Sequence, residues 1–189
     1  MAHVPPLARA VLALASLVGL GLSACDSAPD PLAPAAMDVA SAKVSAKSAG
    51  ASINQQLAAL RRLTAPFHNF EKAEAAGWGT ELTPCLEISL GAQGFHYANL
   101  GYIDGEVDLL KPELLQYEPQ ADGKLRLVGV EYIVPLSAWT SAEPPTLLGQ
   151  EFHVNPVFQV WALHVWLWRA NPSGMFADWN PKVSCAGAS

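Results

Sequence analysis

The sequence has few basic residues and lacks the common short motifs of catalysis and nucleotide binding. It holds 11 lysines and arginines against 17 aspartates and glutamates, and this acidic balance argues against a nucleic-acid partner and against a polybasic membrane-binding surface. GxSxG, HExxH, P-loop and Rossmann glycine patterns are missing, so the sequence gives no support for a serine hydrolase, a zinc metalloprotease or a nucleotide-binding enzyme of the usual kinds. CxxCH is missing too, so covalent haem attachment is excluded, whereas non-covalent haem on one histidine is not.

Long hydrophobic runs are also scarce. The one marked run, residues 11–22, is too short to span a bilayer as a mature helix. It leads into the tetrapeptide LSAC, which resembles the bacterial lipobox, in which the cysteine is diacylated and becomes the mature N-terminus. We therefore predict a signal peptide over residues 1–24 and lipidation of Cys25. An ordinary signal peptide cut at a small residue is the alternative.

The segment that follows has the composition of a tether. Residues 26–50 hold eight alanines, four serines, three prolines and no aromatic residue, so they cannot bury enough apolar surface to offset the entropy lost on ordering. Residues 25–50 are therefore predicted to be a lipidated cysteine and a disordered tether. This places the protein in the bacterial cell envelope, anchored to a membrane and facing the periplasm or the exterior. Asp26 resembles an inner-membrane retention signal, and the choice between inner and outer membrane stays open.

The remaining chain, residues 51–189, has the length of one globular domain with a single core. Two of the three cysteines lie in it, Cys85 and Cys185, and an even pair in an exported protein predicts a disulfide. By the chain-entropy model, closing such a loop of about 100 residues contributes about 4–5 kcal/mol. A metal-binding thiol pair and free thiols are the alternatives.

Helical patterns come first in this domain and strand patterns follow. Ser52 can cap a helix with leucines on one face, and a second helix is predicted from near Pro66 to Ala76, with Gly77 as its stop. Strands are expected after Cys85, at residues 94–100, in a hairpin over 113–135, and at 157–169. The predicted fold class is α+β, with N-terminal helices packed on a mostly antiparallel β-sheet and one disulfide.

Residues 161–185 contain four of the six tryptophans. Both faces of the strand predicted at 157–169 are largely apolar, which favours a strand in the core over the wall of a cofactor site. His164 lies within that strand. A buried polar group without a partner costs about 1–3 kcal/mol, so His164 needs a hydrogen bond, an ion pair or a metal.

Two more titratable residues occur in strands of mainly apolar or aromatic residues. His96 falls on the face opposite its neighbours in the stretch GFHY. Strict alternation places Glu131 on one face with Leu125, Leu127 and Ile133, where a carboxylate needs a cation, a donor or a metal. By contrast, the other acidic residues of this region are interpreted as solvated loop and edge charges: Glu113, Glu118 and Asp104–Asp108.

Two interpretations of Glu131 are open. In the first, it pairs with Arg126, Arg169 or a histidine and fixes the strand register. In the second, His96, Glu131 and His164 converge on one pocket as ligands or acid/base groups.

Two imidazoles and one carboxylate suit Zn²⁺ or Cu²⁺ in an oxidising compartment. His153 lies in the proline-rich stretch 135–156, which is predicted to be a long surface loop. Loops of that length are uncommon unless they serve a site. His153 would then be a fourth ligand or a lid residue.

Six stretches of the chain carry a resemblance: AEAAGW…TPC, GFHYANL, PELLQYEP, GKLRLVGVEY, LHVWLW and NPSGMFADWNPKVSC. Together they resemble a family of uncharacterised exported bacterial proteins and lipoproteins, over most of residues 66–185. The resemblance implies one exported domain and supplies no activity. The more usual form of GFHY has Gly-Met-Gly before the aromatic residue, and this chain departs from it while keeping His96.

These observations predict an exported, membrane-tethered domain that binds a small ligand or a metal through a His/Glu pocket. One alternative is an enzyme that uses the same residues as acid/base groups or metal ligands. The other is a structural or partner-binding lipoprotein. The sequence does not name the ligand, the metal or the oligomeric state.

Overall fold

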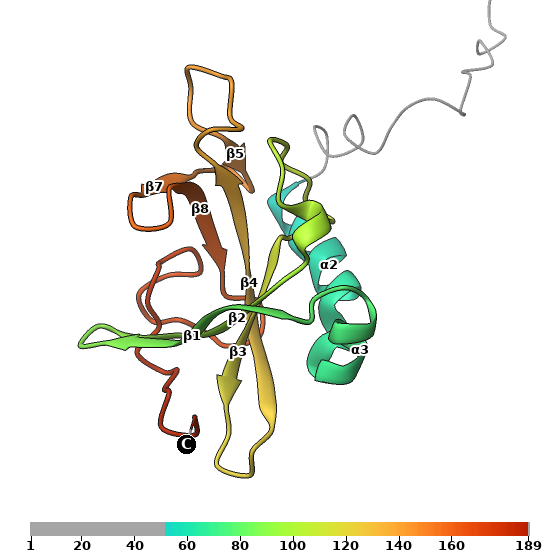
Figure 1. Cartoon of the computed structure of the whole chain (residues 1–189), viewed down its shortest axis with the longest axis vertical. Coiled ribbons are helices and arrows are strands. Elements are labelled where there is room, and N and C mark those ends of the chain that lie inside the picture. The colour runs from blue at the N-terminus through green and yellow to red at the C-terminus, as the bar shows by residue number, and fades with distance from the viewer. Residues whose placement is uncertain (1–51, 189) are drawn as a thin grey trace, which may run out of the picture. The chain divides into compact units, whose positions relative to one another are not determined.

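Helices occupy the start of the described chain, which covers residues 52–188 of the computed structural model, and strands form most of the rest. The α+β class is therefore confirmed (Figure 1). The predicted signal peptide, the lipidation of Cys25 and the tether over 25–50 lie outside the described residues. Within the described residues, no helix is both long enough and apolar enough to cross a membrane.

Helix α2 (Ile53–Thr64) begins where the sequence predicts. The Ser52 hydroxyl accepts the Gln55 N–H, and the Gln55 side chain accepts the Ser52 N–H in return, which makes a capping box. Its inward face is buried at Leu57 and Leu60, whereas Ile53 in the first turn is 45% exposed. The helix therefore attaches to the sheet mainly through its central turns.

The second predicted helix is interrupted. A 3₁₀ turn, η1 (Ala65–His68), is followed by a short helix, α3 (Phe70–Ala75). Between them Asn69 is extended, and its side chain accepts the Lys72 N–H to cap α3. This local hydrogen bond competes with a continuous helix. The chain then turns at Gly77, whose φ of +109° favours glycine.

Six strands form one antiparallel sheet in the order β1-β2-β3-β4-β8-β7. Their bounds are β1 (Thr80–Ile88), β2 (Gly91–Ala98), β3 (Leu114–Pro119), β4 (Leu125–Pro135), β7 (His153–Asn155) and β8 (Val160–Val165), with a 3₁₀ turn η2 (Leu100–Tyr102) after β2. The hairpin predicted over 113–135 is confirmed as β3 and β4. The first strand begins at Thr80 and contains Cys85, so the predicted start of the strands after Cys85 is wrong.

The stretch 135–156 is less irregular than predicted. It contains a two-stranded ribbon of β5 (Thr146–Leu147) and β6 (Gln150–Glu151), and then β7, which pairs with β8. These strands have two or three residues each, which is too short to show a period in the sequence. The pairing with β7 leaves β8 flanked on both edges, as its apolar faces indicated.

A bulge in β4 changes which side chains share a face with Glu131. Gln116 pairs with Gly129 and Tyr117 with Leu127, so Val128 has no partner on β3. The alternation of side chains between the two faces of β4 is therefore interrupted at Val128, and residues before and after it do not follow one alternating pattern. Leu127 packs in the core under the helices, whereas Val128 lies on the other face. The predicted common face for Leu125, Leu127 and Glu131 is wrong for this reason, although Ile133 does lie near Glu131.

The two faces of the sheet are covered differently. Helices α2 and α3 cover one face (Figure 1), where the Tyr117 hydroxyl donates to the Phe67 carbonyl at 2.7 Å and the Trp168 indole donates to Thr64 at 3.1 Å. On the other face two smaller apolar clusters form: Ala98, Leu114, Ile133, Val160 and Ala162 in the first, and Ala92, Val128, Trp166 and Val183 in the second.

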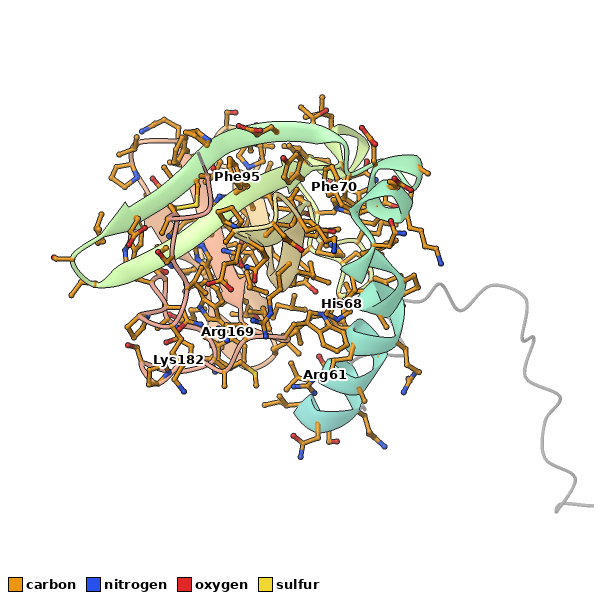
Figure 2. The ribbon with its side chains drawn as sticks, turned by 90° about the horizontal axis from the view of Figure 1, so that it is seen from below. Arg61, His68, Phe70, Phe95, Arg169 and Lys182 are labelled. Atoms are coloured by element: carbon orange, nitrogen blue, oxygen red, sulfur yellow. A yellow bond between two sulfur atoms is a disulfide. The ribbon has the colours of Figure 1, made fainter. Side chains whose placement is uncertain are left out.

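Most of the C-terminal segment, residues 166–188, folds onto this second face, whereas Leu167 and Trp168 pack with the core under the helices. Asn180 pairs with Ala92 at the start of β2, and the Trp166 indole donates to the Ala177 carbonyl at 2.6 Å. Arg169 donates from Nε and Nη2 to the carbonyl of Lys182, which keeps these two residues together at the edge of the molecule (Figure 2). The tryptophan-rich stretch, residues 161–185, thus contributes a strand to the core and a segment that covers the second face of the sheet.

Two acidic side chains predicted to be solvated are buried, so that interpretation was wrong for them. Glu113 accepts the Ile133 N–H at 3.1 Å, and burial raises its pKa to about 9. Glu118 accepts the Ser184 N–H at 3.2 Å and faces Arg126 at 4.0 Å. Glu118 lies in strand β3, all of whose residues are buried, and Glu113 directly precedes that strand. Partners remote in sequence satisfy both carboxylates. Asp104 is exposed, as expected.

The predicted disulfide between Cys85 and Cys185 is present, with the Cα atoms 5.7 Å apart. It ties strand β1 to the C-terminal segment. Beside it, the Cys185 N–H donates to the Glu87 carboxylate at 2.6 Å. The edge hairpin and the C-terminal segment are therefore joined covalently on the face of the sheet that lacks helices.

Removing this disulfide should destabilise the fold strongly. In a Cys85→Ala/Cys185→Ala variant, the free energy of unfolding should fall by about 4–5 kcal/mol, because a loop of about 100 residues is no longer closed in the unfolded chain. Urea unfolding followed by tryptophan fluorescence measures this change. A midpoint equal to that of the oxidised wild type would contradict the assigned role.

Candidate functional site

Three polar residues lie between the two apolar clusters of the sheet face that the C-terminal segment covers. They are His96 on β2, Glu131 on β4 and His164 on β8. On each strand the polar residue is flanked by members of both clusters, for example Ala92 and Ala98 around His96. Each strand thus contributes one titratable group at the same level of an otherwise apolar surface.

The strand register brings these groups together. Glu131 pairs directly with His164 across β4 and β8. His96 pairs with Gln116 on β3, which in turn pairs with Gly129 on β4. Because Gly129 has no side chain, Gln116 can lie over it; a Cβ there would lie 3.0 Å from the Gln116 Oε1 and 2.7 Å from the Val165 carbonyl oxygen.

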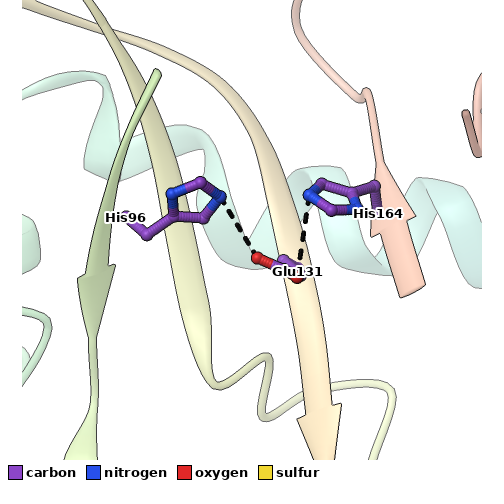
Figure 3. A group of neighbouring side chains, drawn as sticks. All are labelled: His96, Glu131 and His164. Atoms are coloured by element: carbon purple, nitrogen blue, oxygen red, sulfur yellow. Dashed lines mark ion pairs between the residues drawn. The ribbon is translucent and has the colours of Figure 1, made fainter. Parts of the chain in front are cut away.

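The three side chains meet at the carboxylate (Figure 3). His96 Nε2 lies 3.2 Å from Glu131 Oε2, and His164 Nε2 lies 3.6 Å from Glu131 Oε1. The residues are 2%, 6% and 3% exposed in chain order, and one ligand atom from each falls within 4.8 Å of the others. Of the partners considered for Glu131, the histidines are the ones it contacts. Arg126 instead faces Glu118, and Arg169 binds a backbone carbonyl.

Oxygen atoms face the second nitrogen of each ring. His96 Nδ1 is 2.7 Å from the Thr83 hydroxyl, which comes from β1. His164 Nδ1 is 3.4 Å from Asp178 Oδ1, which comes from the C-terminal segment. The rings are therefore approached from both sides, with Glu131 in the middle and an oxygen at each end.

His153 does not join the three-residue group. It lies on β7, and its Nε2 is 3.4 Å from Asp178 Oδ1, the same atom that faces His164. Its prediction as a direct ligand is not supported by this geometry, because Asp178 separates it from the cluster. Sequence reasoning missed Asp178. Its one signal in the sequence is its place between Phe176 and Trp179, and that does not distinguish it from a solvated loop residue.

The charges of the cluster are coupled. Burial alone would raise the pKa of Glu131, but His164 and His96 outweigh it and lower that pKa. Burial alone would lower the pKa of His164, but Glu131 and Asp178 outweigh it and raise that pKa. Interaction with His164 lowers the pKa of Asp178 in turn. The cluster thus favours a positive charge on His164 between two carboxylates.

The contacts of His164 are ion pairs rather than aligned hydrogen bonds. Its Nδ1 and Nε2 are 3.4 and 3.6 Å from carboxylate oxygens, and among the described residues neither nitrogen has a hydrogen-bond partner. Both ring nitrogens are fully buried. Such atoms are uncommon in native structures, and each calls for a partner.

A cavity of about 260 Å³ opens next to His96 and Glu131. Its walls are mainly apolar, formed by Leu86, Ile103, Leu114, Ile133 and Val160, with Leu82 and Phe158 at the rim. Leu82 and Phe158 are 43% and 52% exposed. The cavity therefore connects the buried carboxylate and one histidine with solvent.

Comparisons of this chain with models of protein families, with curated proteins and with solved structures found no match. The resemblance to exported bacterial proteins and lipoproteins stays a prediction from the sequence. The chemistry of the site is therefore argued from its own geometry.

Replacing Asp178 by asparagine should lower the pKa of His164 in the metal-free protein, because the Asp178 carboxylate helps to raise it. A raised folded pKa contributes stability that is fully present below the ordinary value of 6.5 and is lost as the pH rises through the raised value. The stability gap between wild type and variant should thus be widest between the ordinary pKa values of 3.8 and 6.5, and close above the raised pKa of His164.

Ring-proton NMR and thermal unfolding across this pH range measure the two effects. Asp122→Asn is the matched control, because the pKa of Asp122 is also lowered, but by Lys124 in an exposed turn. It should leave the titration of His164 unchanged. An unshifted His164 titration in Asp178→Asn would show that the carboxylate does not act on the ring.

Proposed function

We propose that the domain binds one divalent transition-metal ion, Zn²⁺ or Cu²⁺, through His96, Glu131 and His164, as part of an envelope lipoprotein. The observation that carries this proposal is the buried His164 ring, with both nitrogens unpartnered by hydrogen bonds. An unsatisfied buried polar group costs about 1–3 kcal/mol. A metal ion on Nε2 would satisfy one of these nitrogens and leave the other to Asp178.

The spacing of the ligand atoms supports this. Zinc bonds of about 2.0–2.1 Å in a tetrahedral site place ligand atoms about 3.3–3.4 Å apart. Glu131 reaches the two histidines through different oxygens, with Oε2 3.2 Å from His96 Nε2 and Oε1 3.6 Å from His164 Nε2, so one ion would contact both oxygens, or a single oxygen after a small rotation of the carboxylate. Closing the remaining gap between the rings needs only small side-chain movements, since the three atoms already lie within 4.8 Å.

The surroundings of the rings fit a metal site as well. A metal-bound histidine usually offers its other N–H to an oxygen, which fixes the tautomer and the ring orientation. The Thr83 hydroxyl has this position at His96 Nδ1, and Asp178 has it at His164 Nδ1. The ligand set of two nitrogens and one carboxylate oxygen suits Zn²⁺ and Cu²⁺.

Metal binding and protonation compete for the same ring. The paired carboxylates favour a protonated His164 in the metal-free protein, and a metal must displace that proton. The divalent ion would bring one more positive charge than the proton it displaces, and so would neutralise both Glu131 and Asp178. Affinity should accordingly fall as the pH is lowered.

An enzyme is the second candidate, and the cavity that reaches His96 and Glu131 favours it. Three protein ligands leave one position of a tetrahedral ion for water or substrate. In that case Glu131 or His96 would hold or move a proton at the cavity floor. Metal-dependent hydrolysis of p-nitrophenyl acetate, abolished in Glu131→Gln, would support it over simple binding.

His164→Ala and Glu131→Gln should each weaken metal binding by about 100-fold or more, because each removes a direct ligand. The wild type should bind one Zn²⁺ per chain. Calorimetric titration and elemental analysis after dialysis measure affinity and content. His68→Ala is the control, since His68 is an exposed histidine that contacts Trp168 away from the cluster.

Far-UV circular dichroism on each variant separates loss of metal from loss of fold. If the folded variants keep wild-type zinc content, the site is wrong. If the wild type itself takes up no zinc or copper, the metal proposal fails as a whole.

Membrane attachment is the other part of the proposal, and it rests on the LSAC tetrapeptide that closes the short apolar run. Cys25→Ser should move the protein from the membrane fraction to the soluble fraction of a bacterial host, because no acyl chain can be added. Fractionation with labelled palmitate measures this. Ser27→Ala, which leaves the tetrapeptide intact, should stay in the membrane. A wild type that is already soluble would refute lipidation.

A further inference from the structure

The cavity beside the cluster has a size and lining that select a class of ligand. Its volume of about 260 Å³ lies below the roughly 300–1,000 Å³ of pockets for drug-sized molecules. A ligand that fills it is therefore smaller than a typical drug molecule.

Most of the cavity wall is hydrocarbon, and its two titratable side chains, His96 and Glu131, lie 3.2 Å apart. Leu82, Leu86, Ile103, Leu114, Ile133 and Phe158 supply apolar surface. The titratable residues that line the cavity are His96 and Glu131, and no lysine or arginine lines it among the described residues. A ligand should accordingly have an apolar body and one polar head directed at the cluster.

The coordination chemistry of the ion decides the sign of that head. The two positive charges of a divalent ion would be balanced by the ionised Glu131 at the cavity floor and by Asp178 beside His164, so the preference for a head depends on the ion's open coordination position. The metal's open coordination position favours an oxygen donor with negative charge. The side-chain amides of Gln93 and Asn155 also line the cavity and offer N–H donors. An ammonium head would be repelled by the ion.

We infer that the cavity binds a small apolar monocarboxylate, with its carboxylate on the metal and its hydrocarbon body against the leucine and isoleucine walls. This inference rests on the proposed metal site and adds the class of ligand. Long acyl chains exceed the cavity and would extend past Leu82 and Phe158 into solvent.

Calorimetric titration of the zinc-loaded full-length protein tests the inference with benzoate and hexanoate as probes. Both should bind at least about 10-fold more tightly than acetate, which lacks the apolar body, and than hexylamine, which has the opposite charge. Protein stripped of metal should bind the two probes at least about 10-fold more weakly than zinc-loaded protein.

Two leucines of the same β-hairpin provide a matched pair of variants. Leu82 is at the cavity rim, whereas Leu90 is 64% exposed and does not line the cavity. Leu82→Glu should weaken benzoate binding by about 10-fold or more, since it places a carboxylate where the ligand enters. Leu90→Glu should leave it unchanged. Zinc content should be the same in both variants.

The outcomes separate this inference from the metal site. Zinc binding without benzoate or hexanoate binding refutes the ligand class and leaves the metal site intact. Equal affinity for benzoate and acetate, preference for hexylamine, or equal binding with and without zinc each refute it too. A protein that binds no metal refutes the metal site and this inference together.

Discussion

The sheet face that the C-terminal segment covers depends on one interaction, the pairing of the buried Glu131 carboxylate with His96 and His164. An ionised carboxylate in an apolar setting is stable only when cations or donors surround it. Here the histidines of the strands on either side of the β3–β4 hairpin meet it, with His96 Nε2 3.2 Å and His164 Nε2 3.6 Å away. The alignment of β2, β4 and β8 is thereby specified by charge as well as by packing, because a shift of one residue would turn a ring to the opposite face.

The two faces of the sheet are packed in different ways. Under the helices, large side chains such as Tyr117 and Tyr132 fill a continuous core, and their hydroxyls donate to backbone carbonyls. The other face has two small apolar clusters with the polar group between them. It is covered by an irregular segment rather than a helix, so the Cys85–Cys185 link and the backbone hydrogen bonds between Asn180 and Ala92 hold the cover in place.

Much of the fold follows from local patterns. The Ser52 cap, the turn before Lys124 and the alternation around His96 are short-range signals, and each appears in the structure. Patterns spanning few residues cannot register a bulge, because Val128 reads as one more apolar strand residue until its missing partner is seen. Glu113 and Glu118 were misjudged for a related reason: the groups that satisfy them, at Ile133 and Ser184, are far away in the sequence.

In the candidate site, too, local signals were visible in the sequence and long-range contacts were not. Three polar residues in apolar strands were visible in the sequence, since burying any of them demands a partner. Asp178 was not, because an acidic residue in a loop has an unremarkable solvated alternative. Its role follows only from the path of the C-terminal segment, which brings it within 3.4 Å of both His164 and His153.

The spacing of the cluster along the chain has a consequence for how a metal would be acquired. Its three members are separated by 35 and 33 residues and come from strands that are not all neighbours in the sheet. The unfolded chain therefore has no local chelating pair, and the ligand set exists only after long-range strand pairing is complete. If the proposed site binds a metal, the protein would take that metal from the compartment in which it folds, and the place of folding rather than of synthesis would decide which ion it carries.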